Sequence, residues 1–76
     1  MKKRLWTVRR LVRAAQAAGL RCAQITYRYE FPMTISSPKH GSVTIWEDNT
    51  IVRTDIDPSL AKRMRPVEAA QLLGLA

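Results

Sequence analysis

The chain has 76 residues, a size at which one hydrophobic core gives little net stability, so we expect a single domain over residues 1–76. Its 13 Lys and Arg against 6 Asp and Glu give a formal net charge of +7, which favours an acidic partner such as nucleic acid. A hydrophobic fraction of 46% excludes a disordered chain, and the single cysteine, Cys22, excludes an internal disulfide and fits a reducing cytoplasm.

The N-terminal stretch is predicted to form one amphipathic helix over Lys2–Ala18. At about 100° per residue its apolar side chains share one arc, which we expect to face the core. Gly19 follows as a residue that can take positive φ and end the helix. The predicted core face of this helix consists of Leu5, Val8, Leu11, Val12, Ala15 and Ala18.

The opposite arc of this helix is basic, with Trp6 near its middle. In one interpretation the cations contact phosphates and the Trp6 ring stacks or makes cation–π contacts. In the other they form a solvated face and Trp6 covers a neighbouring element or a second copy of the chain. The first is favoured because no Asp or Glu precedes Glu30 to neutralise the basic arc, which carries Lys2, Lys3, Arg9, Arg10 and Arg13.

After Gly19 the hydrophobic pattern changes to the alternation typical of strands. Pro32 divides the first alternating run into Ala23–Phe31 and Met33–Ser36. Two further strands, Val43–Trp46 and Ile51–Asp55, flank a predicted hairpin turn. We expect an antiparallel meander, and the face of it predicted to cover the first helix carries Tyr27, Tyr29, Phe31, Val43 and Ile45.

The C-terminal part is predicted to be a helix broken at proline. Asp57 is a favoured N-cap residue and Pro58 a favoured first helical residue, so a short helix is predicted to begin here. Pro66 should end this helix after Met64. Residues 66–73 then restart a helix that Gly74 closes. The predicted fold class is therefore α+β: an N-terminal helix packed on a three-stranded antiparallel meander, followed by a proline-broken C-terminal helix.

The sequence contains little that indicates catalysis. His40 is the only histidine and lies in a predicted loop, where we expect it to be exposed. One Cys and one His are too few for a typical zinc site. Glu47, Asp48 and Asp55 are expected to cap turns rather than to form a carboxylate pair. We therefore expect no enzyme activity, no cofactor and no metal.

Two stretches resemble known proteins. The helical run Leu11–Leu20, followed by a hairpin over Val43–Val52, resembles small uncharacterised proteins common in prophages and integrative elements of proteobacteria, which implies a mobile-element setting. The stretch Arg65–Ala76 is similar to the first helix and turn of excisionase-like and MerR-like helix-turn-helix domains. In those families a second helix reads the DNA.

These observations predict a small cytoplasmic protein that binds nucleic acid, with DNA as the expected partner and phosphate contacts as the main source of affinity. The alternative is a phage-type interaction module or inhibitor whose basic, Trp-containing helix docks on an acidic host or phage protein. We expect a homodimer. We expect no membrane association, because no segment could span a bilayer. The candidate nucleic-acid-binding residues are Lys2, Lys3, Trp6, Arg9, Arg10, Arg13, Lys62, Arg63 and Arg65.

Overall fold

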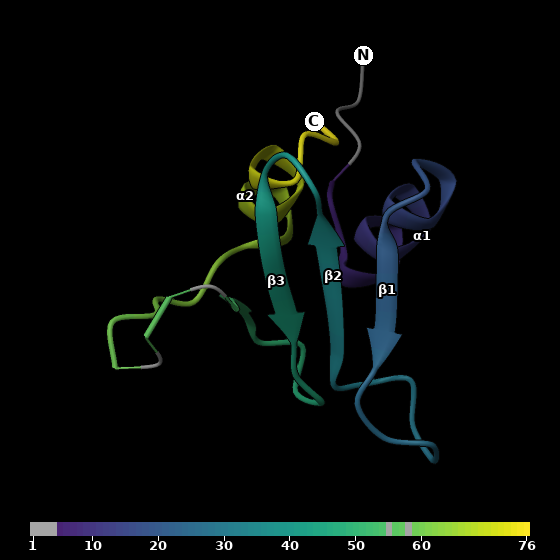
Figure 1. Cartoon of the computed structure of the whole chain (residues 1–76), viewed down its shortest axis with the longest axis vertical. Coiled ribbons are helices and arrows are strands. Elements are labelled where there is room, and N and C mark those ends of the chain that lie inside the picture. The colour runs from purple at the N-terminus through teal and green to yellow at the C-terminus, as the bar shows by residue number, and fades with distance from the viewer. Residues whose placement is uncertain (1–4, 55, 58) are drawn as a thin grey trace.

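The computed structural model describes residues 5–54, 56, 57 and 59–76, which form two helices and a four-stranded antiparallel sheet (Figure 1). The strands lie in the sheet in the order β1-β2-β3-β4, and both helices cover the same face of it. The α+β class is confirmed. In chain order the elements are α1 (Val8–Ala17), β1 (Arg21–Gln24), β2 (Met33–Ser37), β3 (Gly41–Ile45), β4 (Ile51–Arg53) and α2 (Pro66–Leu72).

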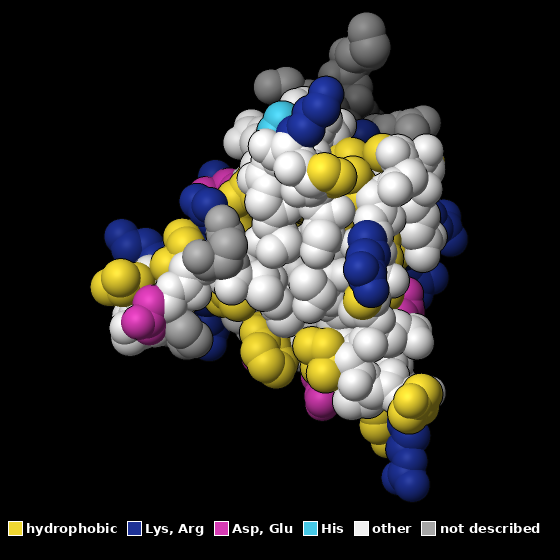
Figure 2. Space-filling model, viewed as in Figure 1, with side chains coloured by type: hydrophobic (Ala, Val, Ile, Leu, Met, Phe, Trp, Pro, Cys, Tyr) yellow, Lys and Arg dark blue, Asp and Glu magenta, His cyan; other side chains and the backbone are white. Residues whose placement is uncertain are grey.

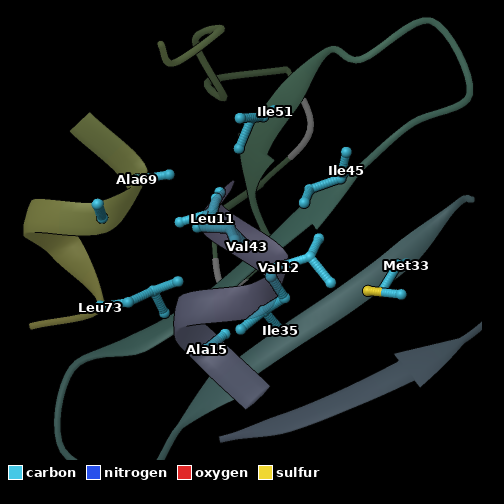
Figure 3. Close-up of a cluster of buried hydrophobic side chains, with 11 residues drawn as sticks. Leu11, Val12, Ala15, Met33, Ile35, Val43, Ile45, Ile51, Ala69 and Leu73 are labelled. Atoms are coloured by element: carbon cyan, nitrogen blue, oxygen red, sulfur yellow. The ribbon is translucent and has the colours of Figure 1, made fainter. Parts of the chain in front are cut away.

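The hydrophobic core lies between the helices and one face of the sheet (Figure 3). Ile35 of β2 pairs with Val43 of β3, and both side chains are fully buried. Leu11 from α1 and Leu73, which follows α2, pack against these strands. The buried hydrophobic residues are Leu11, Val12, Ala15, Met33, Ile35, Val43, Ile45, Ile51, Ala69, Ala70 and Leu73.

The other face of the sheet carries short hydroxyl side chains. Thr34 pairs with Thr44, and Ser36 pairs with Ser42, across β2 and β3. The hydroxyl oxygens of Thr44 and Thr54 lie 2.7 Å apart and share a hydrogen bond. Figure 2 views this face, whose centre is neither charged nor apolar. A second layer of helices is therefore not required on this side of the sheet.

Helix α1 is shorter than predicted. It begins at Val8, because Thr7 has an extended backbone and its Oγ1 accepts a hydrogen bond from the Arg10 N–H at 3.1 Å. Leu5 therefore precedes the helix and is 83% exposed, so its predicted place in the core is wrong. The central part of the predicted core face is confirmed, since Leu11, Val12 and Ala15 are buried.

Both helices end in the same way. Gly19 has φ +77°, and the Leu20 N–H donates to the Ala15 carbonyl at 2.9 Å. Gly74 has φ +75°, and the Leu75 N–H donates to the Ala70 carbonyl at 2.8 Å. These are Schellman ends, in which a left-handed residue lets the chain reverse and satisfies the last carbonyls. The predicted end of each helix at its glycine is confirmed, although Ala18 is exposed and not part of the core.

The predicted strand over Ala23–Phe31 is wrong in most of its length. β1 covers only Arg21–Gln24, and its register with β2 pairs Gln24 with Met33. Residues 25–32 therefore connect the two strands, and the Ile25 N–H donates to the Pro32 carbonyl at 3.1 Å to close this connection. The alternating side chains of residues 25–31 have no partner strand. Instead of three strands, the sheet has four, because β1 and β2 are separate.

The segment between β4 and α2 forms no helix in its described residues. Asp57 Oδ1 accepts hydrogen bonds from the N–H and hydroxyl of Ser59, which closes a turn, and Leu60 is 71% exposed. The Met64 N–H donates to the Ile51 carbonyl at 2.7 Å, so the chain runs beside β4. The prediction of a proline-broken helix is therefore wrong. A single helix begins at Pro66, where the second part of the predicted helix was expected to begin. Asp55 and Pro58 lie outside the described residues.

Candidate nucleic-acid interface

Helix α1 presents a row of arginines on its outer side. Arg9 and Arg13 are exposed, one helical turn apart, and Arg10 beside them is half-buried. Together with Thr7 and Ala14 these three arginines line a shallow hollow. In the part of the chain that the structure describes, no carboxylate pairs with Arg9 or Arg13. Figure 2 shows Lys and Arg side chains along the α1 margin of the molecule.

Trp6 lies before α1, so its predicted place within the basic face of the helix is wrong. Its side chain is half-buried and packs against the core. The guanidinium carbon of Arg10 lies 4.3 Å from the centroid of the Trp6 ring, a cation–π contact, and Arg10 Nη1 donates to the Leu5 carbonyl at 3.4 Å. The ring is therefore already in contact with the protein. A contact of Trp6 with nucleic acid stays a prediction.

The other candidate cations are separated from the α1 row. Lys2 and Lys3 lie outside the described residues, and Lys62 is exposed. The segment that carries Lys62, Arg63 and Arg65 lies on the β4 side of the sheet, away from α1 (Figure 1). The structure thus brings Arg9, Arg10 and Arg13 together and leaves the C-terminal candidates elsewhere.

Two of these C-terminal cations have acidic neighbours. Arg65 Nε lies 3.2 Å from Glu68 Oε1 and forms an ion pair with it. Arg63 lines a hollow with Glu47 and Asp48, beside Trp46. The pKa of Asp48 is lowered chiefly by hydrogen bonds from Thr50, whose N–H lies 3.0 Å from Oδ1, and to a smaller extent by the charge of Arg63. Such neighbours reduce the positive potential around Arg63 and Arg65.

Three side chains that the sequence analysis assigned to the sheet are exposed on the β1–β2 connection. Tyr27 is 106% exposed, Tyr29 is 65% exposed and Arg28 between them is exposed. Phe31 at the end of the connection is half-buried and packs against the core. It lines a hollow with Glu30 and with Thr7, Val8 and Arg9 of the start of α1. The end of the connection therefore lies beside the basic side of α1.

The single cysteine and histidine have local roles. Cys22 is half-buried, burial raises the pKa of its thiol, and its Sγ donates to the Leu20 carbonyl at 3.7 Å. Cys22 thus packs against the core as a small apolar side chain. His40 is exposed in the β2–β3 loop, as predicted. In the described ranges, no three His, Cys, Asp or Glu side chains are close enough together to hold a metal ion.

No family model, curated protein or solved structure matches this chain. Neither α1 nor α2, the helices of the described ranges, is long and apolar enough to cross a bilayer.

Proposed function

We propose that this chain is a small nucleic-acid-binding protein, with DNA as the expected partner, and that it acts as an accessory or regulatory protein of phage or mobile-element type. We place it in the cytoplasm and give it no enzymatic role. The mobile-element setting rests on the resemblance of Leu11–Leu20 and Val43–Val52 described above.

The observation that carries this proposal is the exposed pair Arg9 and Arg13 on α1. No described carboxylate pairs with either guanidinium, so both are available to phosphates without first breaking an ion pair. Glu30 lines a hollow with both arginines, but Arg10 and Arg21 keep the surroundings of α1 positive. A net charge of +7 adds long-range attraction to any polyanion.

Salt dependence tests the proposal. Each phosphate contact on duplex DNA releases condensed counterions, so the log of affinity should fall with log salt by about 0.9 per contact. Arg9→Ala with Arg13→Ala should make the slope shallower by about two and weaken all sequences alike. Fluorescence anisotropy with a labelled duplex at several salt concentrations measures this slope.

The matched control removes an exposed cation away from α1. Lys39→Ala, in the β2–β3 loop, should change the slope less than Arg13→Ala does, although both lose one charge. Equal effects would mean attraction to net charge without a defined interface. Wild-type binding no tighter than about 10⁻⁴–10⁻⁶ M at physiological salt would contradict the proposal.

The alternative function, docking on an acidic protein, is tested by capture of partners from host extract with and without nuclease. Partners that survive nuclease treatment would favour protein docking. The contact of Trp6 with the core and with Arg10 argues against that ring as an interface hot spot, because a hot-spot side chain must be free to enter a pocket on the partner.

We also propose a homodimer. Trp46 is 46% exposed, and β1 is an edge strand that can pair with another strand. Sedimentation at tens of micromolar, about the range in which contacts of this kind are populated, should then give twice the mass of the chain. A monomer at that concentration would contradict this part of the proposal.

A further inference from the structure

The β1–β2 connection presents two aromatic rings to solvent on a closed loop. The Ile25 N–H donates to the Pro32 carbonyl at 3.1 Å, and Pro32 is buried, so the base of the loop is fixed. Tyr27 is 106% exposed and Tyr29 is 65% exposed. Tyr27 gains nothing from packing within the chain, and Tyr29 only lines an open hollow with Glu30, Phe31 and Glu47, so both rings are candidates for an intermolecular role.

These rings are better placed for stacking than Trp6. One face of Trp6 is occupied by the Arg10 guanidinium, and its side chain packs against the core. A base that stacked on that ring would have to displace Arg10. Tyr27 has both faces of its ring in solvent, so a base can approach without any rearrangement.

The end of the loop lies beside the basic side of α1. Glu30 and Phe31, at the end of the loop, share a hollow with Arg9, and Glu30 shares a second hollow with Arg9 and Arg13. Arg28 adds a cation between the two tyrosines. A single strand of DNA whose phosphates contact α1 can therefore continue onto the loop. Its bases would then contact the aromatic rings there.

The composition of the loop favours bases over a protein surface. A protein hot spot is a desolvated cluster surrounded by contacts that exclude water. Here the tyrosines alternate with Thr26, Arg28 and Glu30, so polar side chains separate the apolar ones. Stacking needs only single rings beside cations, and it accepts any base.

We infer that the ligand is single-stranded DNA, with Tyr27 and Tyr29 stacking on unpaired bases while Arg9 and Arg13 contact phosphates. This inference rests on the proposed function and names its substrate class. In a duplex the faces of the bases are stacked on one another, so the tyrosines would have nothing comparable to bind.

The experiment compares a labelled oligo-dT strand with a duplex of equal length by anisotropy across salt. The wild type should bind the single strand more tightly. Tyr27→Ala with Tyr29→Ala should weaken single-strand binding at least about thirtyfold, leave duplex binding unchanged and leave the salt slope unchanged, because stacking displaces no ions. Tyr27→Phe with Tyr29→Phe keeps both rings and should bind as the wild type does.

The outcomes separate this inference from the proposed function. If the alanine pair binds the single strand as well as the wild type does, while Arg9→Ala with Arg13→Ala weakens it, the inference is overturned and the function stands. If the wild type binds neither the single strand nor the duplex, both the inference and the proposed function are contradicted. If the alanine pair loses only a nuclease-resistant protein partner, the loop docks on protein and the inference is overturned. Unchanged circular dichroism of the variants confirms that they fold.

Discussion

Arg65 and Glu68 are joined twice at the start of α2. Glu68 Oε1 accepts one hydrogen bond from the Arg65 backbone N–H at 3.0 Å and another from Arg65 Nε at 3.2 Å. The first satisfies a backbone donor at the helix start, as in the glutamate half of a capping box. The carboxylate therefore stabilises α2 and engages Arg65 at the same time, which makes Arg65 a weaker candidate for phosphate contact than Arg9.

Stability should fall in acid. The pKa of Glu68 is lowered by hydrogen bonds from the Arg65 backbone and side chain, and that of Asp57 by hydrogen bonds from Ser59. A pKa lowered in the folded state contributes stability above the unfolded value, about 4, and this contribution is lost as pH falls through the folded value. Melting temperatures from pH 7 to 2 should therefore decrease less steeply for Glu68→Gln than for the wild type.

The two helix-ending glycines should differ in their tolerance of alanine. Both have positive φ, which costs an alanine about 1–2 kcal/mol. At Gly19 a Cβ would meet nothing within 4 Å, whereas at Gly74 it would lie 2.9 Å from His40 Nε2. Gly74→Ala should therefore lower the free energy of unfolding slightly more than Gly19→Ala, because the exposed His40 side chain has to move aside. In a His40→Ala background the extra loss should disappear, and its persistence in urea unfolding would contradict this account.

Trp6 should contribute to folding. Its half-buried ring packs against the core and under Arg10, so Trp6→Ala should lower the free energy of unfolding by about 1–2 kcal/mol. Trp6→Phe should lose less, because it keeps an aromatic ring. Urea unfolding measures both values. If Trp6→Ala left stability unchanged and weakened single-stranded DNA binding instead, the stacking role would belong to Trp6.

The centre of the sheet should be the part of the chain least tolerant of truncation. Ile35 is fully buried on the core face of β2, so Ile35→Ala should cost about 2–5 kcal/mol and unfold much of so small a domain. Thr34→Ala, its neighbour on the outer face, should cost far less. Thermal unfolding followed by circular dichroism compares the two, and similar losses would mean that the assignment of faces is incorrect.

Residues with strong local signals were predictable from the sequence. Gly19 and Gly74 end their helices as expected, and Pro66 begins α2, because these backbone preferences act within one turn of chain. Helical spacing likewise placed Arg9, Arg10 and Arg13 together on one side. The predicted start of α1 at Lys2 was wrong. The apolar spacing extends back to Leu5, but the Thr7 side chain caps the helix five residues after Lys2.

The exposed tyrosines could not have been found from periodicity. Tyr27 and Tyr29 alternate with polar residues as the residues of a half-buried strand do, and only the pairing of Gln24 with Met33 leaves them without a partner strand. The sequence did contain one relevant signal, Pro32, which has no N–H for a ladder and stands where the loop ends. Register is a property of two strands together, so it is not visible in either run alone.

The bridge between Met64 and Ile51 limits how far the sheet can extend. It lies along the outer edge of β4, so a further strand cannot add there without displacing Met64. Strand addition is left to β1 at the opposite edge. When two copies pair through β1, the β1 edge of each copy is occupied. The two outer strands of the joined sheet are then both β4, where Met64 prevents further strand addition. Growth by this route stops at two chains and cannot continue into a fibre.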